Sequence, residues 1–314
     1  MYEVMMYDGG VYRISEFYEL IEDVGGFIVQ KSQAQQQITV TLAIPEEEKP
    51  VIEAKSDELG GKLIDVPLAG TEIAVVAPTL GRHHMPHPVC DIAEHLRRYG
   101  AITVVMGLAR GKGRKTAQIS AEEKKIVEEY DAAVFVLGNF KDCIVNEKVR
   151  LFEEIEIPVA VIVGPDMDEL PSCEALVCGV GRKAERMRRA EEIEKLEESA
   201  QAVEMIVRDR KRELDEDPLF VHPAEVKQAI EDLDPVQESL RPAPIVLHLD
   251  GLRVKIPYDE WKDTLSQVEV YGRKLGDISE IRDASLTGST IIKILTECEV
   301  KSLDEQREAT TKAS

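Results

Sequence analysis

Three histidines and a cysteine lie close together in the segment GRHHMPHPVCDI, residues 81–92. His83, His84 and His87 all precede Cys90 by seven positions or fewer, in a chain with only 6 histidines. Imidazole nitrogen and thiolate sulfur bind borderline-soft metal ions and iron–sulfur centres. Because few carboxylates accompany them, the segment does not resemble a calcium or magnesium site, which needs oxygen ligands. The residue types therefore favour a transition metal or an iron–sulfur cluster.

The sequence around Cys90 predicts a helix that leaves this thiol outside the core. Pro88 suits the first turn of a helix, where its missing N–H costs nothing. The apolar stripe of that helix consists of Val89, Ile92, Ala93 and Leu96. Cys90 lies about 100° from the start of this stripe, within a first turn whose free N–H groups favour a thiolate. The preceding strand, 72–78, delivers the segment to a sheet edge where α/β proteins bind ligands.

Two other interpretations of the same segment stay open. The loop could be a proline-stiffened surface connection with Cys90 half-buried, since clustered polar groups are often structural. Cys90 could also be a nucleophile with a histidine base, although the sequence shows no third group to orient the base. His95 lies on the opposite flank of the helix and is predicted to be a surface residue.

Two glycine-broken basic segments are candidate contacts for an anion or an acidic partner. The first, GLARGKGRKTAQIS (107–120), departs from a phosphate-binding loop because Arg114 stands where a glycine is required. No acidic magnesium partner can be assigned to it, and we predict no nucleotide on this chain. The second, CGVGRKAERMRR, begins at Cys178. The candidate contact residues are Arg110, Lys112, Arg114, Lys115, Arg182 and Arg186.

The four remaining cysteines do not form a metal-binding pattern. Cys173 and Cys178 are spaced C-x4-C without a second pair, so a zinc ribbon is not supported. Free cysteine behaves as a small apolar residue. We therefore expect Cys143, Cys178 and Cys298 to fill the core.

The composition excludes several classes of function. Lys and Arg total 39 against 60 for Asp and Glu, a net charge of -21 that repels a nucleic-acid backbone. Aromatic residues make up 5%, too few for base-stacking platforms. The start MYEVMMYDGG lacks the features of a secretory leader, and the apolar runs are too short to cross a bilayer. We expect a cytoplasmic protein bound to neither nucleic acid nor membrane.

The patterning of the chain predicts an α/β protein, α+β overall, in several parts. Residues 1–70 follow the order βαββαβ of a ferredoxin-like unit. Residues 71–181 alternate apolar strands with helices, which indicates a Rossmann-like parallel sheet covered on both faces. The remaining parts are a long bridging helix (182–215), a small α+β unit (216–300) with a hairpin turning at Asp250-Gly251, and a polar tail (301–314).

Three stretches together resemble a known family. These are RHHMPHPVCDIAEHLRRYGA, GLARGKGRK and CGVGRKAERMRRAEEIEKLEE. They resemble methanogenesis marker protein 7, which is similar to protein C of the methyl-coenzyme M reductase operon, where a histidine precedes the same Pro-Val-Cys-Asp. The resemblance covers most of residues 1–300, and the Pro-Val-Cys-Asp stretch is its most specific part.

The resemblance implies a non-catalytic subunit of the archaeal assembly that activates methyl-coenzyme M reductase by ATP-dependent reduction of its nickel cofactor F430. Related subunits are implicated in holding complex iron–sulfur clusters of the 8Fe-9S-C type. By this resemblance Cys90 is a cluster ligand together with His84, His83 or His87, and which histidine serves is open. The implied partners are operon protein C, methyl-coenzyme M reductase, other methanogenesis marker proteins and an ATPase subunit. A metal-free scaffold and a nucleotide- or metal-dependent enzyme are the alternatives.

Overall fold

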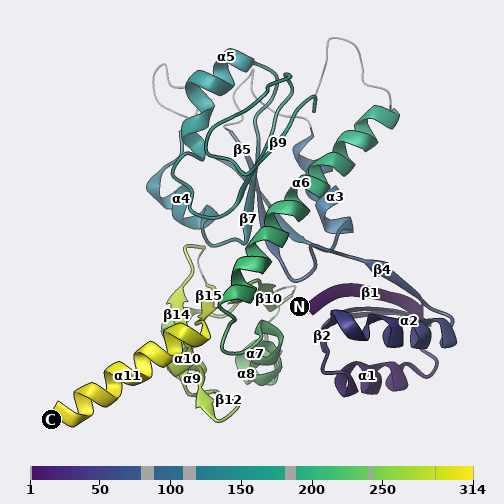
Figure 1. Cartoon of the computed structure of the whole chain (residues 1–314), viewed down its shortest axis with the longest axis vertical. Helices are drawn as coiled ribbons and strands as arrows, with labels where there is room; N and C mark the ends of the chain where they lie inside the picture. The colour runs from purple at the N-terminus through teal and green to yellow at the C-terminus, as the bar shows by residue number, and fades with distance from the viewer. Residues whose placement is uncertain are drawn as a thin grey trace. The chain divides into compact units, whose positions relative to one another are not determined.

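The computed structural model describes residues 2–78, 88–108, 118–180, 189–239, 241, 243–286 and 288–313. The chain divides into two compact units, one formed by Met1–Gly70 with Arg212–Ser314 and the other by Thr71–Lys211 (Figure 1). Within the described residues, no helix combines the length and the apolar character that crossing a bilayer requires.

The N-terminal part of the first unit is the predicted ferredoxin-like βαββαβ sandwich. Its antiparallel sheet has the order β2-β3-β1-β4. Helices α1 and α2 cover one face of this sheet. The elements are β1 (Tyr2–Gly10), α1 (Ile14–Asp23), β2 (Phe27–Ala34), β3 (Gln37–Pro45), α2 (Lys49–Glu58) and β4 (Lys62–Asp65).

A tyrosine and two glycines organise this small core. Tyr7 of β1 is fully buried and packs against Phe17 of α1, with their ring centroids 4.5 Å apart. A Cβ added to Gly9 would come within 2.2 Å of the Tyr7 hydroxyl oxygen, and one added to Gly61 would come within 2.1 Å of the Tyr7 ring. The two glycines are therefore required because the phenol ring occupies the space of a side chain.

The C-terminal part of the first unit is a mixed α+β fold built on an antiparallel sheet of order β10-β11-β15-β14. Its helices and a two-stranded ribbon, β12-β13, surround one apolar cluster. The elements are α7 (Pro223–Ile230), α8 (Asp234–Gln237), β10 (Ile245–His248), β11 (Gly251–Val254), α9 (Tyr258–Gln267), β12 (Glu269–Val270), β13 (Arg273–Lys274), α10 (Leu275–Ile278), β14 (Ser279–Asp283), β15 (Thr290–Ile294) and α11 (Glu297–Ala313).

The predicted hairpin is present, with two differences in detail. His248 pairs with Gly251, so the turn consists of Leu249 and Asp250 and not of Asp250-Gly251. Gly251 is needed because an added Cβ would lie 2.0 Å from the carbonyl oxygen of Ile292 on β15. From its alternation with leucines we expect His248 to face outward, but it is 6% exposed. That expectation is wrong because β10 is buried on both faces.

The polar C-terminal tail is helical and not irregular. α11 continues through Ala313 and is fixed to the unit by Val300, which is buried. Asp304 accepts hydrogen bonds from Arg273, with a shortest separation of 2.9 Å, and Asp277 accepts one from Arg307 at 2.7 Å. Few apolar residues are therefore enough to hold this helix, because ion pairs along one side supplement them.

The second unit contains the predicted Rossmann-like parallel sheet, in the order β6-β5-β7-β8-β9. All residues of β5, β7 and β8 are buried, as expected for strands covered on both faces. The strand order reverses between β5 and β7. The elements are β5 (Glu72–Ala77), α3 (Val89–Arg98), β6 (Ile102–Gly107), α4 (Ala121–Val127), β7 (Ala132–Val136), α5 (Lys141–Cys143), β8 (Val159–Ile162) and β9 (Ala175–Val177).

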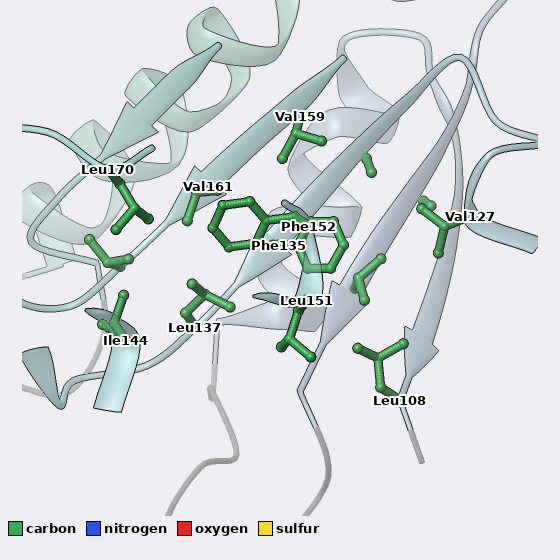
Figure 2. Packing of buried hydrophobic residues seen from close by; sticks show 14 of the residues in the cluster. Leu108, Val127, Phe135, Leu137, Ile144, Leu151, Phe152, Val159, Val161 and Leu170 are labelled. Atoms are coloured by element: carbon green, nitrogen blue, oxygen red, sulfur yellow. The ribbon is translucent and has the colours of Figure 1, made fainter. Parts of the chain in front are cut away.

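Two layers of helices cover this sheet. One face packs on α4 and on the helical segment 141–151, in a cluster where the rings of Phe135 and Phe152 lie 5.4 Å apart (Figure 2). Helix α3 covers β5 and β6 on the other face and contacts α6 (Arg189–Glu216). α4 begins with a capping box, in which Ser120 accepts the Glu123 N–H at 3.1 Å, as the Ser-x-x-Glu spacing of residues 120–123 predicts. The contacts of α3 with β5, β6 and α6 fix the helix that carries Cys90.

The long helix has 28 residues, Arg189–Glu216. At 1.5 Å per residue it spans about 42 Å. The boundary between the two compact units falls inside it, between Lys211 and Arg212. The start predicted at residue 182 lies outside the described residues.

Candidate functional site

The candidate site lies at the carboxyl edge of the parallel sheet. β5 and β7 are neighbours, and the helices that follow them lie on opposite faces of the sheet, α3 on one face and the helical segment 141–151 on the other. Open α/β sheets bind ligands at such a reversal of strand order. The histidine- and cysteine-containing segment follows β5, and therefore begins at this edge.

Cys90 is placed as the helical pattern predicts. Val89, Ile92, Ala93 and Leu96 are at most 7% exposed and form the buried side of α3, whereas Cys90 is exposed. Pro88 is the N-cap residue, and its carbonyl accepts the Ile92 N–H at 2.8 Å. The thiol therefore belongs to the first turn of the helix and does not contribute to packing.

The other predicted site residues fall outside the described part of the chain. These are His83, His84, His87, Arg110, Lys112, Arg114, Lys115, Arg182 and Arg186. Among the described residues, no group of three or more His, Cys, Asp or Glu side chains is arranged to hold a metal ion. A metal site of three or more such ligands at Cys90 would therefore need at least one ligand from outside the described residues.

His95 connects α3 to the long helix and is not the surface residue that the sequence predicts. Its side chain is 12% exposed, and its Nε2 lies 3.6 Å from Oε1 of Glu197. The Tyr99 hydroxyl donates a hydrogen bond to the same carboxylate, and this bond raises the pKa of Tyr99 to about 12. Glu197 of α6 thus joins two residues on one side of α3. The i, i+4 spacing of His95 and Tyr99 is the sequence signal for this contact.

The Cys90 helix is also tied to the edge strand β6. The Thr103 hydroxyl donates to the Ala93 carbonyl at 3.2 Å, and Arg97 Nη2 donates to the Thr103 carbonyl at 3.2 Å. Because these bonds act on the middle and the end of α3, they set the position from which its first turn presents Cys90.

A buried lysine at the same sheet edge was not predicted. Lys148 is 1% exposed, and its Nζ donates to the Leu137 carbonyl at the end of β7. Burial lowers the pKa of this ammonium group. Lys148 ends a π-helical stretch, Ile144–Lys148, and π-helical turns are frequent at functional sites. The lysine falls on an i, i+4, i+7 stripe with Ile144 and Leu151, a pattern that could have identified it as buried.

The remaining cysteines differ from Cys90 in their surroundings. Cys143 and Cys178 are partly buried, and the Cys178 thiol donates to the Met167 carbonyl at 3.4 Å. Burial raises the pKa of Cys173 to about 11, so this thiol stays protonated. The expectation that Cys298 fills the core is wrong: it is exposed at the start of α11, where a hydrogen bond to Asp217 raises its pKa.

A protein-family model matches most of the chain. The model describes methyl-coenzyme M reductase operon protein C, and it matches residues 2–268. This match agrees with the resemblance to protein C that the Pro-Val-Cys-Asp stretch indicates. The more specific resemblance to methanogenesis marker protein 7 stays a prediction.

Relatives of two kinds support the match. An uncharacterized protein of Methanocaldococcus jannaschii is 45% identical over 302 residues, which cover 96% of each chain. The methyl-coenzyme M reductase I operon protein C of the same organism is 29% identical over 31% of this chain and 54% of its own length. Operon protein C of Methanosarcina barkeri is 29% identical over 29% of this chain and 48% of its own length. The matches to proteins named operon protein C therefore span about half of those relatives.

Proposed function

We propose, from the premise that this chain belongs to the methyl-coenzyme M reductase operon protein C family, that it is a non-catalytic subunit of the assembly that activates methyl-coenzyme M reductase. The family relation supports a role associated with methanogenesis. In the full proposal the chain holds an iron–sulfur cluster, of the 8Fe-9S-C type or a simpler one, and passes electrons toward the nickel cofactor F430.

The single observation that carries this proposal is the exposure of Cys90 in the first turn of α3. A thiol that packs no core is available as a ligand, and it stands at the sheet edge where this fold class binds ligands. The donor types also fit the group, because thiolate and imidazole both bind iron of such clusters. Cys90 would hold the cluster together with His84, His83 or His87. When bound, the cluster supplies one-electron transfer.

The chain's own residues would position this ligand. Glu197 fixes α3 from the side of the long helix through Tyr99 and His95, and Thr103 fixes it from β6. Lys148 ties the neighbouring strand end of β7 to the helix that follows it. Rigid support of this kind keeps a ligand in place while the electron count of its metal changes.

The partners in the proposal are operon protein C, methyl-coenzyme M reductase, other methanogenesis marker proteins and an ATPase subunit. ATP hydrolysis is assigned to the ATPase because Arg114 interrupts the phosphate-loop pattern of this chain. The basic candidates Arg110, Lys112, Arg114, Lys115, Arg182 and Arg186 would then contact an acidic partner or an anionic group.

Anaerobic purification of the full chain with two matched variants tests the cluster. Cys90→Ala and Cys298→Ala each remove one exposed thiol, but only the first lies at the sheet edge. We expect wild type and Cys298→Ala to carry iron, sulfide and visible absorbance, and Cys90→Ala to lose all three. Equal iron in both variants, or an iron-free wild type from the intact assembly, would contradict the proposal. Single His83→Asn, His84→Asn and His87→Asn variants then identify the histidine.

A metal-free scaffold in the same assembly is the second candidate. One observation favours it: the long helix leaves the apolar side chains of Ile193 and Met205 48% and 47% exposed, which a partner chain could cover. This candidate predicts that Cys90→Ala leaves the activation of methyl-coenzyme M reductase unchanged. Deleting the long helix would instead prevent assembly.

A further inference from the structure

We propose that Tyr2, Tyr271 and Glu225 together bind an arginine side chain of a partner protein. The two phenols lie beside one carboxylate, and among the described residues this carboxylate pairs with no lysine or arginine. All three residues belong to the first compact unit, whereas Cys90 belongs to the second. The inference therefore does not depend on the proposed cluster.

The ring of Tyr2 is held in place by two other rings. The ring centroids of Tyr2 and Phe27 lie 5.3 Å apart, and those of Tyr2 and His222 lie 5.1 Å apart. The Tyr2 hydroxyl donates to the Gly25 carbonyl at 3.1 Å, which fixes the orientation of the ring. Despite these contacts, Tyr2 is 37% exposed. It therefore presents a fixed aromatic surface to solvent, and an aromatic surface of this kind attracts cations.

Tyr271 is exposed and lies in a turn that does not favour tyrosine. It is 75% exposed and is the first residue of the two-residue turn between β12 and β13. Its φ is 49°, and that of Gly272 is 74°. A turn with two positive φ values favours asparagine, aspartate or glycine, and a tyrosine there is strained. The Tyr271 hydroxyl donates to Oε1 of Glu225, which holds the ring beside that carboxylate. Because the ring is exposed, it is available to a ligand.

Glu225 gives this surface a negative charge that is not compensated. Its carboxylate accepts the backbone N–H of His222 at 2.8 Å and the hydroxyl of Tyr271, and both donors are neutral. A carboxylate accepts about four hydrogen bonds, so capacity remains for a charged donor. Glu47 adds a second charge, since burial, Glu225 and Glu47 together raise the pKa of Tyr2. Among the described residues, neither glutamate lies within ion-pair distance of a lysine or an arginine.

An arginine side chain matches this surface better than other cations do. Its planar guanidinium stacks on aromatic rings, donates two N–H groups to one carboxylate and is weakly hydrated. The ammonium of lysine is a compact, strongly hydrated charge. A metal ion would need more ligands, and the described residues contain no group of three or more His, Cys, Asp or Glu that could hold one. Two rings beside a carboxylate therefore suit guanidinium.

The source of this arginine is a different protein with a basic segment. A second copy of this chain carries the same net charge of -21, and repulsion between like charges disfavours its approach. A basic segment is instead attracted by that charge, and the attraction weakens as salt is added.

Fluorescence anisotropy of labelled peptides with the full chain tests the site. The probe is the peptide Gly-Ser-Arg-Gly-Ser-Arg-Gly-Ser, and two control peptides carry citrulline or lysine in place of both arginines. Citrulline keeps the shape of arginine without its charge. We expect the arginine peptide to bind wild type, the lysine peptide to bind more weakly and the citrulline peptide not to bind.

Three variants separate the site from the general charge of the chain. Tyr271→Asn removes the ring but suits the turn, and Glu225→Gln removes the charge but keeps an oxygen for the His222 N–H. Each should weaken binding of the arginine peptide about tenfold, as the loss of a cation–π contact or of a charged hydrogen bond predicts. Glu122→Gln removes an exposed charge from α4 in the second unit and should leave the affinity unchanged.

NMR of the wild-type chain with isotope-labelled tyrosine keeps the test decisive if a variant does not fold. The arginine peptide should shift the ring signals of Tyr2 and Tyr271. It should leave the signal of Tyr12 unchanged, although Tyr12 is 80% exposed in the same unit.

Four results would overturn the proposal. They are equal binding of the arginine peptide and either control peptide, an unchanged affinity in both site variants, an equal loss of affinity in Glu122→Gln, and unshifted signals of Tyr2 and Tyr271. A dimer of the chain in sedimentation that Tyr271→Asn abolishes would overturn it as well, because a second copy would then be the occupant.

Discussion

The N-termini of α7 and α3 each carry a side chain that could do chemistry, and the two side chains are used differently. At the start of α7, the His222 Nδ1 accepts the Ala224 N–H at 3.2 Å, and Glu225 accepts the His222 N–H at 2.8 Å. At the start of α3, Pro88 is the N-cap residue without a side-chain cap, and Cys90 is exposed. Folding uses the imidazole, whereas it leaves the thiol available.

The surroundings of His222 show how completely this side chain is used. Its ring stacks on the ring of Phe27, with the two centroids 4.9 Å apart and an interplanar angle of 3°. The ring of Tyr2 also packs against it, at a centroid distance of 5.1 Å. The imidazole therefore joins α7 to strands β1 and β2 of the ferredoxin-like sheet within the first unit. Burial lowers the pKa of His222 to about 4, which keeps the ring neutral and able to accept its hydrogen bond. A residue type alone thus does not identify a functional site, because the hydrogen bonds and burial of the side chain decide whether it is available to a ligand.

The largest expected effect on stability is that of replacing His222, whose side chain caps α7. His222→Ala deletes a helix cap and two ring contacts, and we expect it to lower the free energy of unfolding by about 3 kcal/mol. His222→Asn is the matched control, because asparagine also caps helices and should recover part of the loss. Urea denaturation followed by circular dichroism measures both. A loss below about 0.5 kcal/mol for His222→Ala, as for an ordinary surface site, would show that this contact is not structural.

In the wild-type protein, the contribution of His222 should appear as a loss of stability at acidic pH. Unfolded histidine has a pKa near 6.5, while burial lowers the pKa of folded His222 to about 4. As pH falls from about 6.5 to 4, the unfolded chain takes up a proton that the folded chain refuses, so stability decreases by up to about 3 kcal/mol. Above pH 6.5 both states are neutral and this contribution is complete. The difference in unfolding free energy between wild type and His222→Asn isolates it from the carboxylates, and a difference independent of pH would contradict it.

A smaller effect is expected where α3 meets the long helix. Glu197→Gln removes the carboxylate whose hydrogen bond and charge raise the pKa of Tyr99, so the phenol should ionise closer to pH 10 than to 12. The absorbance difference between each protein and its Tyr99→Phe counterpart reports this ionisation alone. We expect a stability loss of about 1 kcal/mol, because glutamine replaces a hydrogen bond to a charged acceptor by the weaker bond to a neutral one. If the Tyr99 ionisation does not move, Glu197 does not hold α3 in solution.

The sequence predicts the parts of this molecule that depend on local pattern. The apolar strands of the parallel sheet, the Ser120–Glu123 capping box and the exposure of Cys90 all follow from residue spacing along one element. The βαββαβ order likewise determines the antiparallel sheet, because that connection pattern has one common arrangement.

The features that were missed depend on partners distant in sequence. Lys148 is buried because the Leu137 carbonyl, 11 residues away at the end of β7, accepts a hydrogen bond from its ammonium group. The His95 side chain is only 12% exposed because α6 packs against its side of α3 and brings Glu197 within 3.6 Å. Alternation does not reveal that His248 is buried, since both faces of its strand are covered. Such contacts are set by tertiary packing, which local periodicity does not encode.

The smallest effect on stability, and the clearest difference in chemistry, is expected for Cys90. Cys90→Ala should change the unfolding free energy by less than about 0.5 kcal/mol, because the side chain packs nothing. In the metal-free chain, iodoacetamide should modify Cys90 first. Cys298 should follow more slowly although it is also exposed, because its hydrogen bond to Asp217 raises its pKa. Mass spectrometry of peptides taken over time gives the order. Modification of the partly buried Cys173 before Cys90 would show that the first turn of α3 is covered, and the contrast with His222 would then fail.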